Sequence, residues 1–87
     1  MLSDIKLILG ITSSSFDAIL NQYIASAKLD LEMSGIASDR IVESDALIYS
    51  AIVSYVLSMV DTYEYRELSA NSYLLQKDQL RHYTEYR

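Results

Sequence analysis

The stretch DALIYSAIVSYVLSMVD, residues 45–61, places 15 uncharged residues between two aspartates. Wound as a helix, it is apolar over more than half of its circumference, whereas a helix on a protein surface usually shows an apolar arc of about 100°. Ser44 stands just before it as a candidate N-cap, with Asp45 in the first turn. The sequence therefore predicts a helix near 44–64 that neighbouring elements cover on two sides.

A membrane is not the expected environment of this helix. Fifteen residues span roughly 22 Å of helix, less than the ~30 Å hydrocarbon layer. The run also contains three serines and two tyrosines, and no Lys or Arg cluster flanks it. The N-terminal MLSDIKLILG is acidic before it is basic and lacks the order of parts of a secretory signal.

The composition predicts one small domain over residues 1–87. The chain has no cysteine, so neither a disulfide nor a thiolate–metal site stabilises it. Hydrophobic residues make up 51% of the sequence, which is high for so small a domain and predicts that some apolar surface faces another chain. The net charge is −5 with scattered bases. This balance argues against specific nucleic-acid binding, which depends on clustered Lys and Arg.

Three further helices are expected, so the predicted fold class is all-α: a small bundle of three main helices plus a short N-terminal one. The short helix lies near 3–9 and ends at Gly10. The second, near 15–34, has apolar residues three and four apart and ends at Gly35. The last, near 71–85, has no single apolar stripe. The predicted core consists of Phe16, Ile19, Leu20, Tyr23, Ile24, Ile48, Ile52, Tyr55 and Met59.

No constellation of residues supports catalysis, a cofactor or a metal. His82 is the only histidine and is interpreted as a surface or interface residue. Two isolated glycines cannot form a phosphate-binding loop. The acids between Gly35 and the third helix lack the spacing of a calcium loop. Ser50, Ser54 and Ser58 form one stripe, which is either a solvent-facing side or a place for close helix–helix approach.

Eight tyrosines among 87 residues favour protein–protein contact, because tyrosine combines a broad apolar ring with a polar tip. Tyr65, Tyr83 and Tyr86 lie in charged surroundings and are expected at such contacts. The full predicted interface, with neighbouring subunits or other partners, consists of Tyr49, Val53, Val56, Val60, Tyr83, Tyr86 and Arg87.

The order of helices resembles that of the head–tail connector proteins of tailed bacteriophages and prophages, also called neck adaptor or head-completion proteins. The resemblance covers nearly the whole chain and rests on Asp4, Ile5, Lys6, Phe16, Asp17, Leu20, Tyr23, Ile24, Ala27, Tyr73, Leu80, Tyr86 and Arg87. The connector after Gly35 departs from the family, since it lacks the prolines that many relatives carry there.

This resemblance implies a non-enzymatic structural subunit. About a dozen copies would form a ring that joins the portal of the DNA-filled head to the tail. The implied partners are further copies of the chain, the portal protein and a tail-side neck or stopper protein, with DNA passing through the ring. Related proteins were labelled DNA-packaging proteins. The implied location is the virion neck, or the host cytoplasm during assembly.

Other classes of function remain as alternatives. A generic helical adaptor or a dimerising regulator would show the same helices, and light scattering with size-exclusion chromatography separates it from a ring. A helix-turn-helix repressor would need a basic recognition helix, whereas Lys28, Arg40, Lys77 and Arg81 are isolated from one another in the sequence.

Overall fold

The computed structural model describes residues 1–60 and 62–87, and every element in this part of the chain is helical. The four α-helices are α1 (Leu2–Leu9), α2 (Asp17–Met33), α3 (Ala46–Ser58) and α4 (Arg66–His82). Two short 3₁₀ turns, η1 (Ser38–Arg40) and η2 (Thr84–Tyr86), lie in the α2–α3 connection and at the C-terminal end. The predicted all-α fold with a short N-terminal helix is confirmed.

The helix ends differ from the expected ones where the sequence offers no clear punctuation. Both glycines end helices as predicted, because Gly10 and Gly35 have φ angles of 71° and 101°, which other residues rarely adopt. The third helix, by contrast, ends at Ser58 instead of near 64, and α4 begins at Arg66 instead of near 71. No glycine or proline marks this turn. Residue 61, which the expected third helix included, lies outside the described residues.

The N-cap of α3 is Asp45 and not Ser44. One carboxylate oxygen of Asp45, Oδ1, accepts the backbone N–H groups of Leu47 at 2.9 Å and Ile48 at 3.2 Å. These are two of the donors that the first turn of a helix leaves without an intrahelical partner. The aspartate at this position therefore starts α3.

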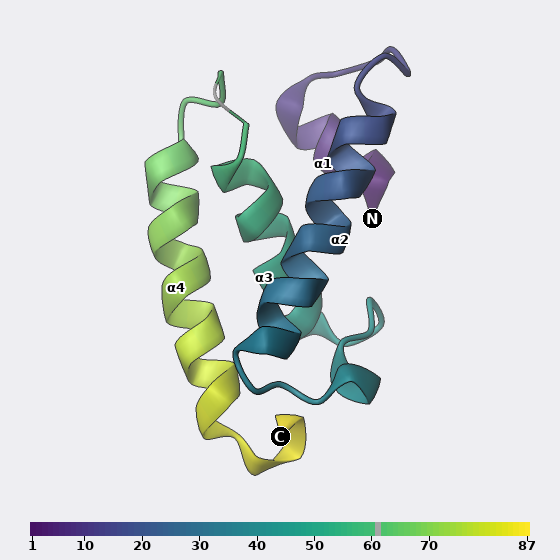
Figure 1. Ribbon diagram of the computed structural model, residues 1–87. Helices are drawn as coiled ribbons and strands as arrows, with labels where there is room; N and C mark the ends of the chain where they lie inside the picture. Colours follow the sequence, from purple (N-terminus) through teal and green to yellow (C-terminus); the bar gives the residue numbers. More distant parts are fainter. Residues whose placement is uncertain (61) are drawn as a thin grey trace.

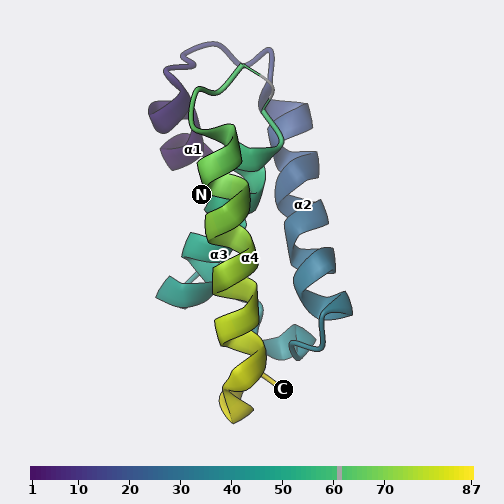
Figure 2. The ribbon, with the colours of Figure 1, turned by 90° about the vertical axis from the view of Figure 1, so that its left-hand side faces the viewer.

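Helix α3 is the centre of the molecule. It packs against α4 and α2, which lie on either side of it, and α1 adds a smaller contact (Figure 1). Turned by 90°, the molecule shows α4 in front and α1 and α2 on opposite sides (Figure 2). The whole chain is elongated, with extents of 39 × 23 × 19 Å.

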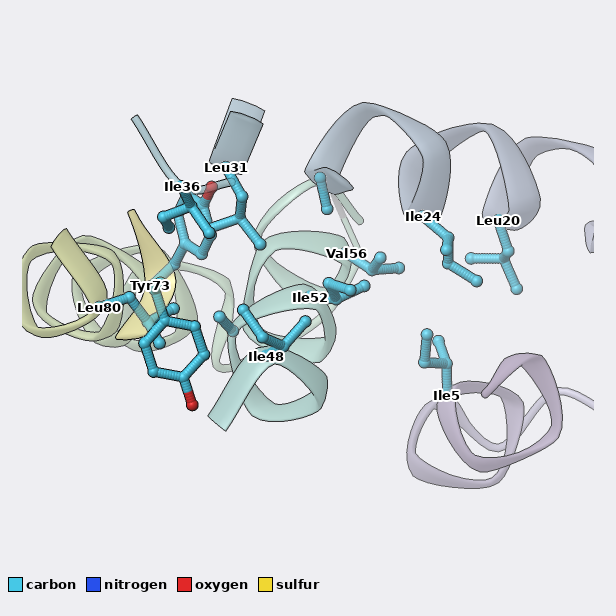
Figure 3. Close-up of a cluster of buried hydrophobic side chains, with 13 residues drawn as sticks. Ile5, Leu20, Ile24, Leu31, Ile36, Ile48, Ile52, Val56, Tyr73 and Leu80 are labelled. Carbon is cyan, nitrogen blue, oxygen red and sulfur yellow. The ribbon is translucent and has the colours of Figure 1, made fainter. Parts of the chain in front are cut away.

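The core gathers around α3 and draws on every helix. Ile48, Ile52 and Val56 of α3 face side chains from the other elements, and Ile5 of α1 points toward Leu20 and Ile24 of α2 (Figure 3). The buried cluster consists of Ile5, Leu20, Ile24, Ala27, Leu31, Ile36, Ile48, Ala51, Ile52, Val56, Tyr73, Leu80 and Tyr86.

The predicted core is right in its middle and wrong at its ends. Leu20, Ile24, Ile48 and Ile52 are buried, and Tyr23 and Tyr55 are half-buried against the cluster. Phe16, Ile19 and Met59 are exposed instead, with 53%, 43% and 42% of their surface accessible. These three lie at one end of the bundle, where α2 and the turn after α3 leave a groove between them.

Candidate interaction surfaces

The seven residues predicted as an interface fall into three classes of burial. Val56 and Tyr86 are buried within their own chain. Tyr49, Val53 and Val60 are half-buried, and Tyr83 and Arg87 are exposed. Two of the seven side chains therefore offer almost no surface to a neighbour, and the others do not form one continuous patch.

The wide apolar arc of α3 is covered by other helices of the same chain. Ile5 of α1 is fully buried, and the Tyr49 hydroxyl of α3 donates a hydrogen bond to the Asp4 carboxylate of α1. Bonding to this carboxylate raises the pKa of Tyr49. The short N-terminal helix therefore supplies a cover that the sequence interpretation assigned to a neighbouring subunit. Along the serine stripe, Ser50 is exposed, and Ser54 and Ser58 are half-buried.

The C-terminal turn is fixed to the α2–α3 connection through Tyr86. The Tyr86 hydroxyl donates to Asp45 Oδ2 at 2.7 Å, and the Tyr86 carbonyl accepts the N–H of Ala37 at 2.6 Å. The bond to Asp45 raises the pKa of Tyr86 to about 12. Tyr83 and Arg87, on either side of Tyr86, remain exposed at this end of the molecule.

A third tyrosine–aspartate pair joins α2 to α4. The Tyr73 hydroxyl donates to Asp30, and Lys77 Nζ lies 3.2 Å from the same carboxylate. Burial alone would raise the pKa of Asp30, but the hydrogen bonds from Tyr73 and Lys77 outweigh it and leave that pKa below its usual value. Burial and the nearby carboxylate raise the pKa of Tyr73. This cluster ties the middle of α4 to the C-terminal half of α2 and so fixes the position of one helix along the axis of the other.

An apolar groove of about 520 Å³ opens at the end of the molecule that holds the α3–α4 turn. Its walls come from the end of α1, the first turns of α2 and the turn after α3. Within residues 1–60 and 62–87, Glu64 is the one charged lining residue, and the Lys6–Asp17 ion pair, at 2.8 Å, joins α1 to the start of α2. The lining residues are Ile8, Leu9, Ile11, Phe16, Ile19, Leu20, Tyr23, Met59, Val60, Thr62, Tyr63, Glu64 and Tyr65.

The groove contains two residues that the sequence placed at contacts, Val60 and Tyr65, and five that it placed in the core. Sequence periodicity could not find the groove, because it shows which face of a helix is apolar and not where the covering helix diverges. An apolar concave surface with few polar groups is typical of a docking site for another molecule.

The opposite end of the molecule carries a polar hollow of about 330 Å³, lined by Ser34, Gly35, Asp78, Arg81, His82 and Arg87. Arg87 Nε donates to the Arg81 carbonyl at 3.1 Å, and His82 Nδ1 lies 2.7 Å from the Asp78 carbonyl oxygen. The side chain of His82 is exposed, as predicted for a surface residue.

Chemistry beyond binding has little support in these surfaces. Residues 1–60 and 62–87 hold no cluster of three or more His, Asp and Glu side chains that could ligate a metal. In the same part of the chain, no helix is both long and apolar enough to cross a membrane. The fold and its surfaces define a small helical protein.

Comparison with known families places the chain within this class. Residues 1–71 match the phage connector protein family, and the chain belongs to that family. Searches of curated proteins and of solved structures each found no significant match. Family membership gives the chain a structural connector role in a bacteriophage, as a virion-associated protein that contacts other head and tail proteins.

Proposed function

We propose that this chain is a neck subunit, of which about a dozen copies form a ring that joins the portal of the DNA-filled head to the tail. Membership of the phage connector protein family supports the proposal. The portal protein on one side and a tail-side neck or stopper protein on the other are the proposed partners. Its proposed location is the virion neck, preceded by the host cytoplasm during assembly.

The observation that carries the proposal is the difference between the two ends of an elongated molecule. The apolar groove with Phe16 and Ile19 lies at one end, and the polar hollow with Arg81 and Arg87 lies at the other. A subunit that joins two different structures needs two different contact surfaces, and we assign one end to each. The net charge of −5 also favours a channel to which passing DNA does not adhere.

The proposed end contacts retain three residues of the predicted interface, half-buried Val60 and exposed Tyr83 and Arg87. Val60 contributes to the groove, and Tyr83 and Arg87 contribute to the opposite end. Val56 is unsuitable for testing them, because an aspartate at this fully buried position would disrupt the core and remove the whole subunit.

The test uses phage that carry Ile19→Asp, in the groove, or Tyr83→Asp, at the opposite end. Both side chains are exposed, so we expect folded subunits with melting temperatures close to that of the parent. We expect filled heads and separate tails to accumulate in electron micrographs. Asn21→Asp, at an exposed position of α2 outside both ends, is the control and should give joined particles. Normal numbers of infectious particles from both end variants would contradict the proposed function.

A further inference from the structure

The outer faces of α2 and α4 point away from the core on opposite sides of the molecule. Helix α3 lies between them (Figure 1), and the residues that face it include Ala27 and Leu31 of α2 and Tyr73 and Leu80 of α4. A residue two positions from a buried one is turned by about 200° around a helix. Leu29, between Ala27 and Leu31, is accordingly 56% exposed.

Leu75, two residues after Tyr73, shows the same pattern on α4 and is 69% exposed. Both leucines are left largely uncovered by the rest of the described chain. Met33 continues the apolar surface on α2, and Leu68 continues it on α4; both are exposed.

Each outer face is an uncharged stripe along the whole helix. Residues on the two stripes recur every three or four positions, while charged residues such as Lys28, Glu32, Glu67 and Arg81 lie beside them. The α2 stripe consists of Ala18, Gln22, Ala25, Leu29 and Met33, and the α4 stripe consists of Leu68, Asn71, Leu75, Gln79 and His82. Depletion of charge with exposed apolar side chains marks the centre of a protein–protein interface.

We propose that the α4 stripe of one copy packs against the α2 stripe of the next copy, and that this contact closes the ring. The inference rests on the proposed function and names the surface by which its subunits meet. Two different patches on opposite sides of one subunit make a head-to-tail contact, which is the kind that generates rings. The centres of the two stripes, around Leu29 and Leu75, carry no charged residue, so copies with a charge of −5 place no like charges against each other there.

The relative height of α2 and α4 within one subunit determines which residues would meet in this contact. Helices α2 and α4 run in the same direction (Figure 1), and Asp30 meets Lys77 at 3.2 Å and accepts from Tyr73. The stretch around residue 75 is therefore level with the stretch around residue 30. A rotation about a ring axis along these helices preserves height, so Leu75 of one copy meets Leu29 and Met33 of the next.

The size of the contact explains why it would need a closed ring. Two 17-residue helices are about 25 Å long, and packing them side by side buries on the order of 500 Å² per subunit. A stable two-protein interface buries about 800 Å² per partner. A single contact is therefore weak, whereas a subunit in a ring makes it twice. Isolated copies are expected to be monomers in dilute solution.

Disulfide cross-linking tests the register directly, because the natural chain has no cysteine. Phage particles are prepared with Leu29→Cys and Leu75→Cys in the same chain. These positions lie on opposite sides of one subunit, so they can join only different copies. We expect oxidised particles to give a ladder of linked subunits up to the closed ring on a non-reducing gel. The matched control pairs Leu29→Cys with Leu74→Cys, since Leu74 is 57% exposed but lies on a different face of α4. We expect the control pair to give at least roughly tenfold less cross-linked subunit, because a disulfide requires Cα atoms within about 7 Å.

The outcomes separate this contact from the proposed function. A ladder from the Leu75 pair, absent from the Leu74 pair, supports the stripe contact. Particles that contain the subunit but give no ladder, or equal ladders from both pairs, would overturn the stripe contact and leave the neck role intact. Absence of the unsubstituted subunit from purified particles would overturn the proposed function itself, and the ring contact with it.

Discussion

Asp45 both caps the start of α3 and binds the C-terminal turn. Its Oδ1 caps α3 by accepting two backbone N–H groups, and its Oδ2 accepts the Tyr86 hydroxyl. The hydrogen bond from Tyr86, supported by the two N–H groups, outweighs burial and lowers the pKa of Asp45. The two oxygens of the carboxylate let Asp45 cap the helix and bind the C-terminal turn at once.

Replacing Tyr86 by Phe is predicted to weaken the fold in a pH-dependent way. At pH 7 we expect a loss of about 1.5–3 kcal/mol, the usual range for a hydrogen bond to a charged group. Because the folded-state pKa of Asp45 is depressed, its contribution is present above the ordinary value of 3.8 and is lost as the pH falls through the lower folded value. The pKa of Tyr86 is raised to about 12, so the bond is also lost as the pH rises from its ordinary value of 10.0 through that value.

Urea unfolding of Tyr86→Phe and the parent at pH 7 and pH 3 measures this effect. The difference in free energy of unfolding between the two proteins should shrink at pH 3. Tyr83→Phe is the control, because Tyr83 is exposed, and it should behave like the parent at both values. If Tyr86→Phe were as stable as the parent at pH 7, the hydrogen bond from Tyr86 to Asp45 would not stabilise the docked C-terminal turn.

Among the elements, α3 was predicted to pack partly against a neighbouring subunit. Its apolar arc does need neighbours on more than one side, but α1, α2 and α4 of the same chain provide them. The excess apolar surface appears on other elements instead, including Leu7 of α1, Met33 of α2 and Leu75 of α4. The proposed contact with neighbouring copies is therefore placed on the outer helices and not on α3.

Core truncations are predicted to differ by position along α2 and α3. Ile52→Ala and Leu20→Ala remove buried side chains and should each cost about 2–5 kcal/mol of the free energy of unfolding. Ile19→Ala, one position from Leu20 but in the exposed wall of the groove, should cost less than about 1 kcal/mol. Denaturant melts of the three variants measure these values, and equal losses at Leu20 and Ile19 would mean that the groove is closed in solution.

Much of the fold followed from local signals in the sequence. Gly10, Gly35 and the spacing around Leu20 and Ile52 indicated four helices and the middle of the core, because those signals depend on one helix at a time. The start of α4 was missed, since its N-cap, Tyr65, has no capping side-chain bond. The groove and the burial of Val56 could not be predicted, because both depend on where separate helices diverge or meet.

At the scale of the whole molecule, the structure gathers bases that are separated in the sequence. Arg81, His82 and Arg87 share one hollow, together with Asp78. Tight duplex DNA binding relies on a larger patch that releases many counterions, and this chain carries seven Lys and Arg against twelve acids. The charge around a DNA channel is therefore expected to repel the duplex rather than bind it.

We predict no binding of the isolated protein to duplex DNA at physiological salt. Fluorescence anisotropy with a labelled duplex should stay flat up to protein concentrations of about 100 μM, the range of weak non-specific binding. The matched control is Asp78→Lys, which removes the acid from the basic hollow and should bind more than the parent at low salt. Micromolar binding by the parent that weakens steeply with added salt would contradict the prediction.

The docking of Tyr86 has a consequence for when the protein can fold during synthesis. Its partners, Ala37 and Asp45, leave the ribosome about forty to fifty residues earlier, when the side chain that covers this end of the core is still inside the exit tunnel. Until Tyr86 emerges, the capping carboxylate of α3 has one oxygen unoccupied and nearby core residues such as Ile36 lack part of their cover. Nascent chains are thus expected to complete this end of the core only after Tyr86 has emerged.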